Sequence, residues 1–102
     1  MSPFRLTPSA ERDLEEIVGY IASEAGPARA ESVRMKIVEA ARRLADMPSM
    51  GHGREDLTVR PVLFWTVHDF LIVYRPETSP LEVIRVLHGA RDPEVLRREI
   101  DR

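Results

Sequence analysis

Cysteine is absent from this chain of 102 residues, and only six of its residues are aromatic. Without cysteine there is no disulfide framework, no thiol nucleophile and no cysteine-based zinc site. The chain also lacks a run of about 20 apolar residues, the length that a membrane-spanning helix needs. Residues 1–7 are too short and too polar for a secretory signal peptide. We therefore expect a protein of the cytoplasm that has no membrane partner.

The chain has no large excess of charge of one sign, since 15 basic residues face 17 acidic ones and the formal net charge is −2. General nucleic-acid binding depends on the number of phosphates neutralised, so such a chain binds poorly unless its arginines cluster in the fold. Aliphatic residues are abundant, because apolar residues make up 43% of the chain and few of them are aromatic. A chain of this length forms one compact domain. We predict a single domain over residues 1–102.

Two amphipathic helices are predicted in the first half of the chain, after a short strand that begins at Phe4. Thr7 and Pro8 provide an N-cap and a first helical residue. Gly26 and Pro27 stop this helix and start the next one. The apolar residues of both segments recur at spacings of three and four, which places them on one face of each helix. These features predict a helical hairpin.

Three runs rich in Val, Ile, Phe and Tyr follow at residues 62–67, 70–74 and 81–87, and short turns separate them. They predict an antiparallel meander. Residues 94–100 form a short C-terminal helix if their apolar side chains find a surface to cover. The predicted fold class is α+β with the order β-α-α-β-β-β, in which the helical hairpin packs on an antiparallel sheet.

The sequence carries no recognisable metal or cofactor site. Its three histidines, His52, His68 and His88, show none of the ligand spacings of zinc sites. The glycines on either side of His52 lack the spacing of a phosphate-binding loop. We therefore expect neither a metal nor a cofactor. His88 closes the last strand just before a turn, so a half-buried structural histidine and a functional one both stay open.

Arg85 interrupts the apolar run of the last strand. Two-residue alternation predicts that Arg85 shares a sheet face with Val83 and Leu87. The same alternation predicts that the other face holds Ile84, Val86 and His88.

Two interpretations of Arg85 are open. Spacing alone favours a partly open sheet face on which Arg85 pairs with Glu82 or Glu77. The alternative is functional: a cluster of arginines on the sheet face receives an acidic peptide or a phosphate group. The arginines of that cluster are Arg60, Arg75, Arg85 and Arg91.

The two ends of the chain resemble a known family. Residues 6–17 read LTPSAERDLEEI, and residues 83–93 read VIRVLHGARDP after the strand FLIVYR at 70–75. With the predicted order of elements, these segments resemble the ParE branch of the RelE/ParE toxin superfamily over nearly the whole chain. The second segment is the more specific of the two.

This resemblance implies the toxin of a type II toxin–antitoxin module. A ParD-like antitoxin silences such a toxin in a hetero-oligomer, because a partly disordered segment of the antitoxin folds onto it. The usual target of the ParE branch is DNA gyrase, which is inhibited by binding, so the resemblance implies no catalytic residue. DNA is contacted only indirectly, through the antitoxin.

The RelE branch offers an alternative, a ribosome-dependent mRNA endoribonuclease. The positions at which RelE-like nucleases place cations on the sheet hold Phe64 and Leu71 here. A catalytic site would then rest on His88 and Arg91, although in-line cleavage of RNA usually needs several placed groups. A third reading is a degenerate, non-toxic member that acts only in the antitoxin complex.

Two sets of residues follow as predicted sites. The predicted target surface consists of Arg60, Arg75, Arg85, His88, Arg91 and Asp92. The predicted antitoxin-binding residues are Leu14, Ile17, Ile21, Val33, Ile37, Arg75 and Arg85.

Overall fold

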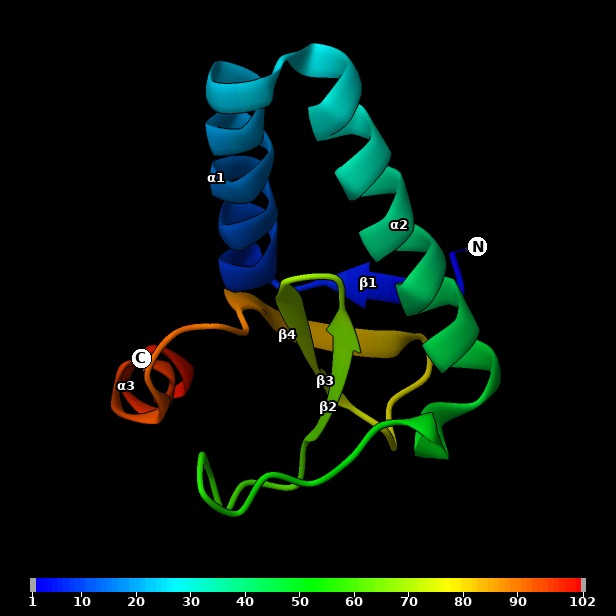
Figure 1. Ribbon diagram of the computed structural model, residues 1–102. Coiled ribbons are helices and arrows are strands. Elements are labelled where there is room, and N and C mark those ends of the chain that lie inside the picture. The colour runs from blue at the N-terminus through cyan, green and yellow to red at the C-terminus, as the bar shows by residue number, and fades with distance from the viewer. Residues whose placement is uncertain (1, 102) are drawn as a thin grey trace.

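The helical hairpin and a third helix lie on opposite faces of one sheet (Figure 1). The computed structural model describes residues 2–101. In chain order the elements are β1 (Phe4–Leu6), α1 (Pro8–Ala25), α2 (Pro27–Asp46), the short 3₁₀ helix η1 (Pro48–Met50), β2 (Leu63–Val67), β3 (Phe70–Arg75), β4 (Leu81–His88) and α3 (Pro93–Ile100). This order confirms the predicted α+β fold class and its C-terminal helix.

The ends of the two long helices follow from the predicted capping residues. Thr7 is the N-cap of α1, and its hydroxyl accepts a hydrogen bond of 3.2 Å from the backbone N–H of Ala10. Gly26 separates α1 from α2 with a φ of 92°, in the region that favours glycine. The chain therefore reverses within one residue, and the two helices lie side by side (Figure 1).

The sheet has the strand order β1-β4-β3-β2. Strands β2, β3 and β4 form the predicted antiparallel meander, but β1 pairs with β4 in parallel, so the sheet is mixed. The reason lies at Thr7, where β1 leads into α1. Its backbone N–H donates to the Val83 carbonyl at 3.0 Å, and its hydroxyl donates to the Ile84 carbonyl at 2.9 Å. These bonds fix β1 alongside β4 in the same direction.

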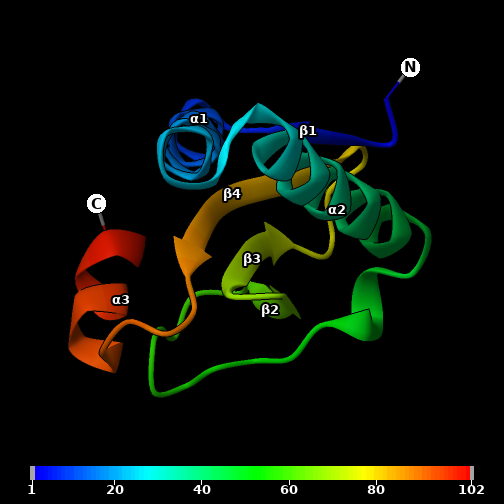
Figure 2. The same cartoon turned by 45° about the horizontal axis from the view of Figure 1, so that its top comes forward.

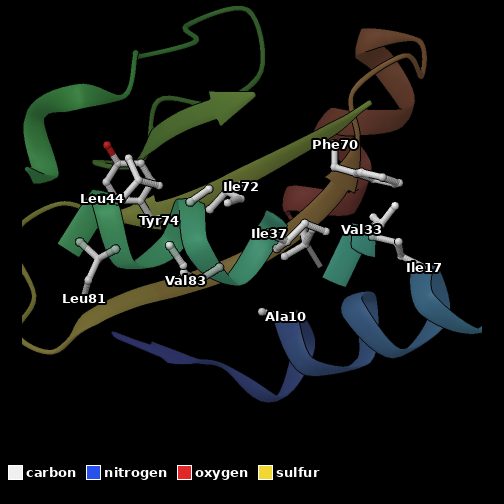
Figure 3. Close-up of a cluster of buried hydrophobic side chains, with 13 residues drawn as sticks. Ala10, Ile17, Val33, Ile37, Leu44, Phe70, Ile72, Tyr74, Leu81 and Val83 are labelled. Carbon is white, nitrogen blue, oxygen red and sulfur yellow. The ribbon is translucent and has the colours of Figure 1, made fainter. Parts of the chain in front are cut away.

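Both faces of the sheet are buried. The hairpin covers one face, where Ile17, Val33, Ile37 and Leu44 pack against the sheet around Ile72 (Figure 3). Helix α3 and the loop before β2 cover the other face, as the tilted view shows (Figure 2). The core on that second face consists of Leu57, Val62, Phe64, Leu71, Val73, Ile84, Leu87, Leu96 and Ile100. Because it is covered twice, β3 is a continuous apolar run rather than an alternating one.

A β-bulge in β4 changes the faces that simple alternation predicts. Val73 lies opposite Arg85, whereas the next residue of β3, Tyr74, lies opposite Val83, so Ile84 is an extra residue. As a result Val83 and Val86 face the hairpin, and Ile84 and Leu87 face α3. The prediction that Val83 and Leu87 share one face and Ile84 and Val86 the other is therefore wrong.

Candidate functional site

A polar cleft of about 330 Å³ lies where α1, the end of β4 and α3 meet. Its polar and charged lining residues come from all three elements and from the turn before α3. They are Ser9, Arg12, Asp13, Glu16, Arg85, His88, Arg91 and Glu99. We call this the polar cleft.

The Asp13–Arg85 ion pair is the centre of the polar cleft. Arg85 donates from Nε to Asp13 Oδ2 at 2.7 Å and from Nη2 to Asp13 Oδ1 at 2.9 Å, which is the bidentate geometry of strong guanidinium–carboxylate pairs. Asp13 Oδ2 also accepts the backbone N–H of Val86 at 3.0 Å. The bond to Asp13 raises the pKa of the Arg85 guanidinium above its ordinary value, because it favours the charged form.

This pairing corrects the sequence-based interpretation of Arg85. Its side chain is only 14% exposed, and its partner is Asp13 of α1 rather than Glu82 or Glu77. A further Arg85 N–H donates to the backbone carbonyl of Glu99 in α3. Arg85 lies opposite Val73, on the sheet face that α3 covers, so its side chain reaches the junction of α1 and α3 instead of lying on an open sheet face. Arg85 therefore joins α1, β4 and α3.

The other predicted residues of this region have structural partners as well. The Arg91 guanidinium forms an ion pair with the Glu99 carboxylate. Asp92 is the N-cap of α3, and its carboxylate accepts the backbone N–H of Glu94 at 2.9 Å. The His88 ring is half-buried and lies against Phe70, with ring centroids 5.2 Å apart.

A second cavity, of about 350 Å³, opens where β1, the ends of β3 and β4, and the C-terminal end of α3 meet. We call it the arginine cleft, and its lining residues are Arg5, Thr7, Ser9, Arg60, Arg75, Glu82, Ile84, Arg85 and Ile100. Three of the four arginines predicted to cluster therefore line one cavity. Arg91 lines the polar cleft instead.

Glu82 organises the arginine cleft. Its side chain is only 9% exposed, and its two carboxylate oxygens bind different arginines: Oε2 binds Arg5, and Oε1 binds Arg75 at 2.5 Å. Arg5, Glu82 and Arg75 are aligned across three neighbouring strands. Arg60 is held by a bond of 3.1 Å from Nη1 to the Ile100 carbonyl. Arg5 is absent from both predicted sites, although a lone arginine between Phe4 and Leu6 is the signal that would have placed it opposite the hairpin.

A third cavity, also of about 330 Å³, lies between α1 and α2 above the turn that joins β2 to β3. We call it the hairpin groove, and its lining residues are Ile17, Tyr20, Ile21, Glu24, Ala25, Arg29, Ser32, Val33, Lys36, His68, Asp69, Phe70 and His88. The ring of Tyr20 stands at this groove with 63% of the residue exposed. His88 borders both the hairpin groove and the polar cleft.

Comparison with known proteins places this geometry in a family. A family model described as the ParE toxin of the type II toxin–antitoxin system, parDE, matches residues 4–93. The chain belongs to this ParE toxin family. A solved structure of the chromosomal ParDE TA system from P. aeruginosa contains a similar chain, with a TM-score of 0.71 and 24% identity over 83% of this chain and 92% of that one. That likeness shows a shared fold. No curated protein matches the chain in sequence.

Within this ParE family chain, part of the predicted antitoxin-binding set belongs to the core. Ile17 and Ile37 are 3% exposed and Val33 is 9% exposed, so these side chains hold the hairpin on the sheet. Leu14 and Ile21 are partly buried against the same core. The apolar stripe that suggested a docking face is therefore mainly the packing face of the hairpin, and Ile37 lines none of the three cavities described above.

The positions that matter for the nuclease alternative are also apolar and buried. Phe64 is 3% exposed and Leu71 is 5% exposed, and both lie in the core under α3. Within residues 2–101 no three histidine, aspartate or glutamate side chains lie together in a way that could hold a metal ion. No helix among the described residues is long and apolar enough to span a membrane.

Proposed function

We propose that this ParE family chain is the toxin of a toxin–antitoxin pair in the cytoplasm, kept inactive by a ParD-like antitoxin in a hetero-oligomer. The proposal extends the family membership, which gives the toxin class but not the partner of this chain. Its main structural support is the hairpin groove, the cavity that combines an apolar floor with an exposed aromatic residue.

The shape and charge of the hairpin groove fit a helical segment of an acidic partner. Ile21 and Phe70 contribute apolar surface, and Tyr20 offers the kind of exposed ring that anchors many protein interfaces. Arg29 and Lys36 add positive charge along the α2 side of the groove. An amphipathic helix with acidic residues beside its apolar face would complement both features.

Tyr20→Ala tests this docking site. The partner is the product of the neighbouring reading frame, which we expect to encode a ribbon-helix-helix protein. Loss of an aromatic anchor should weaken the complex by about tenfold or more in isothermal titration calorimetry. Met35→Ala is the matched control, because Met35 is an exposed apolar residue of α2 that does not line the groove. Equal affinities of the two variants would exclude the groove as the main docking site.

We propose further that the toxin inhibits DNA gyrase by binding. The polar cleft supports a binding role, because Asp13, Arg85, Arg91 and Glu99 are all committed to ion pairs or helix contacts. General acid–base catalysis needs groups that are free to exchange a proton with a substrate. The expected result is loss of gyrase supercoiling with the purified chain and its recovery on addition of the antitoxin. Unchanged supercoiling at a large excess of the chain would contradict this target.

One observation favours the second candidate, a ribosome-dependent mRNA endoribonuclease. His88 and Arg91, the two residues of the predicted catalytic site, line the same cleft, so a phosphodiester that displaced Glu99 from Arg91 would meet both of them there. This activity predicts cuts in messenger RNA after induction that His88→Ala abolishes. Intact messenger RNA at a toxic level of expression would exclude the nuclease activity. Harmless expression of a folded chain that still binds the antitoxin would instead support a non-toxic member that acts only in the antitoxin complex.

A further inference from the structure

The arginine cleft and the hairpin groove lie at opposite ends of the same strands. Strand β3 begins at Phe70 in the groove and ends at Arg75 in the cleft. Strand β4 runs in the opposite direction, from Glu82 in the cleft to His88 in the groove. A helix seated in the hairpin groove would therefore leave the arginine cleft open. A ligand of the cleft can be distinguished from the antitoxin.

The lining of the arginine cleft carries an excess of positive charge. Within residues 2–101, four arginines line it together with a single carboxylate, Glu82. Arg85 is neutralised by Asp13 from outside the cleft, and Glu82 is shared between Arg5 and Arg75. Arg60 is held by a neutral backbone carbonyl. Among the residues that the structure describes, four guanidinium groups thus face two carboxylates, which leaves an excess of two positive charges.

The arginines of the cleft are held in place by the protein, but most of their N–H donors are not engaged by the described part of the chain. Arg5 and Arg75 are fixed by the buried Glu82, whose backbone N–H is itself bound by the Thr78 hydroxyl at 2.8 Å. Within residues 2–101, the guanidinium groups of Arg5, Arg60 and Arg75 each use only one N–H group for a bond to the protein. Their other donors are free for a ligand, and the one bond that holds each side chain lowers the entropy cost of ordering it when a ligand binds.

We propose that the arginine cleft binds a phosphate group, carried either by a free nucleotide or by a nucleic-acid strand. A phosphate presents acceptor oxygens in several directions, so it can accept bonds from guanidinium groups on β1, on β3 and in the loop before β2 at once. A single carboxylate is planar and offers fewer directions for bonds. Glu82, for example, binds only two of these arginines. A volume of about 350 Å³ accommodates a phosphate and an attached sugar. This site depends neither on gyrase nor on the identity of the antitoxin.

The test uses the full chain and a fluorescently labelled single-stranded DNA, with binding followed by anisotropy. The double variant Arg5→Ala/Arg60→Ala removes two donors of the cleft and leaves the Arg75–Glu82 pair in place. We expect its dissociation constant to rise by about tenfold or more, because bonds to charged groups are among the stronger ones. The slope of log affinity against log salt should become shallower by about 1.4, the value for two lost phosphate contacts on a single strand.

The matched control is Arg42→Ala/Arg98→Ala, which removes the same charge from exposed positions of α2 and α3 outside the cleft. It should bind as the wild type does. Thermal unfolding shows whether each variant is folded. If the double variant unfolds, the single variant Arg60→Gln replaces it, because this change leaves the pairs of Glu82 with Arg5 and Arg75 intact. The proposal also predicts that binding persists when the antitoxin occupies the groove.

Competition distinguishes the two sources of the phosphate. Displacement of the strand by AMP, with inorganic phosphate acting more weakly, assigns the site to a nucleotide. Affinity that increases with strand length, with little competition by AMP, assigns it to nucleic acid. The proposal is overturned if the wild type binds none of these probes at low salt, or if both double variants lose the same affinity. Tighter binding of a polyglutamate peptide than of either phosphate probe would also overturn it.

Discussion

The Asp13–Arg85 pair allows a direct measurement of what burial adds to an ion pair in this fold. Both side chains are largely covered, with 12% and 14% exposure, and the guanidinium also binds the Glu99 carbonyl. We consider the single variants Asp13→Asn and Arg85→Gln and the corresponding double variant. Each single change leaves a charge without its partner at the junction of α1, β4 and α3.

The expected magnitude follows from the number of bonds and from the burial. Arg85→Gln leaves the Asp13 carboxylate with only the Val86 N–H out of three donors. Breaking a fully buried pair costs about 3–5 kcal/mol. Because the polar cleft admits water to this pair, we expect about 2–4 kcal/mol of lost stability for each single variant. The double variant should lose less than the sum of the two, with a coupling energy of about 1.5–3 kcal/mol.

The chain supplies a matched control in Arg54 and Asp56. This pair has the same bidentate geometry, with both bonds at 2.9 Å, but its side chains are 36% and 52% exposed. The corresponding cycle, Arg54→Gln with Asp56→Asn, should give no coupling that can be resolved, because water screens exposed pairs. Urea unfolding followed by circular dichroism measures all variants, with the free energy of unfolding taken from linear extrapolation.

If burial strengthens the Asp13–Arg85 pair, its coupling energy must exceed that of the exposed Arg54–Asp56 pair. Equal coupling energies in the two cycles would mean that burial at the helix junction adds nothing to the strength that the bidentate geometry alone provides. A large loss in the double variant, as great as the two single losses together, would mean that the residues act independently.

Three further variants test other parts of the fold. Tyr74→Phe should cost about 1–3 kcal/mol, because the buried hydroxyl accepts the Gly51 N–H at 2.9 Å and donates to the Pro48 carbonyl at 2.6 Å. Burial raises the pKa of Tyr74, so wild-type stability, which is full below about pH 10, should fall as the pH rises further, and Tyr74→Phe should remove that fall in urea titrations at several pH values. Gly51→Ala should lower the melting temperature, because the added Cβ would collide with the Tyr74 hydroxyl and lie 2.9 Å from the Phe64 carbonyl. Asp92→Ala should cost about 1 kcal/mol through loss of the α3 cap, measured by the same urea unfolding.

Local patterns in the sequence were sufficient for the strands and the three α-helices and for their order, but not for the short helix η1. Thr7 and Gly26 fix the ends of the hairpin through interactions with their immediate neighbours, and such interactions can be read from a single segment. The parallel pairing of β1 with β4 could not be read in this way. It depends on bonds between residues that lie more than 70 positions apart, such as the one from Thr7 to Ile84.

The arginines show the same limit at the level of the site. One of the two interpretations of Arg85 grouped it with Arg60, Arg75 and Arg91, and Arg60, Arg75 and Arg85 line one cavity. The expected pairing of Arg85 with Glu82 or Glu77 on an open face is wrong, because α3 covers that face and Asp13 reaches Arg85 from α1, and neither contact can be read from the strand itself. Asp13 could not be distinguished from the other acidic residues of α1, since its role depends on a strand that comes late in the chain.

Helix α3 bears on the choice between the two proposed activities. It covers the sheet face where Phe64 and Leu71 lie, and it is attached through the fully buried Leu96 and Ile100. Exposing these two side chains would cost about 3–6 kcal/mol, so fewer than about one molecule in a hundred would present that sheet face to RNA. A nuclease would have to work from the polar cleft alone, where the Arg91 guanidinium is engaged by Glu99. A toxin that acts by binding needs no such rearrangement, because α3, the polar cleft and the arginine cleft already lie at the surface of the folded chain.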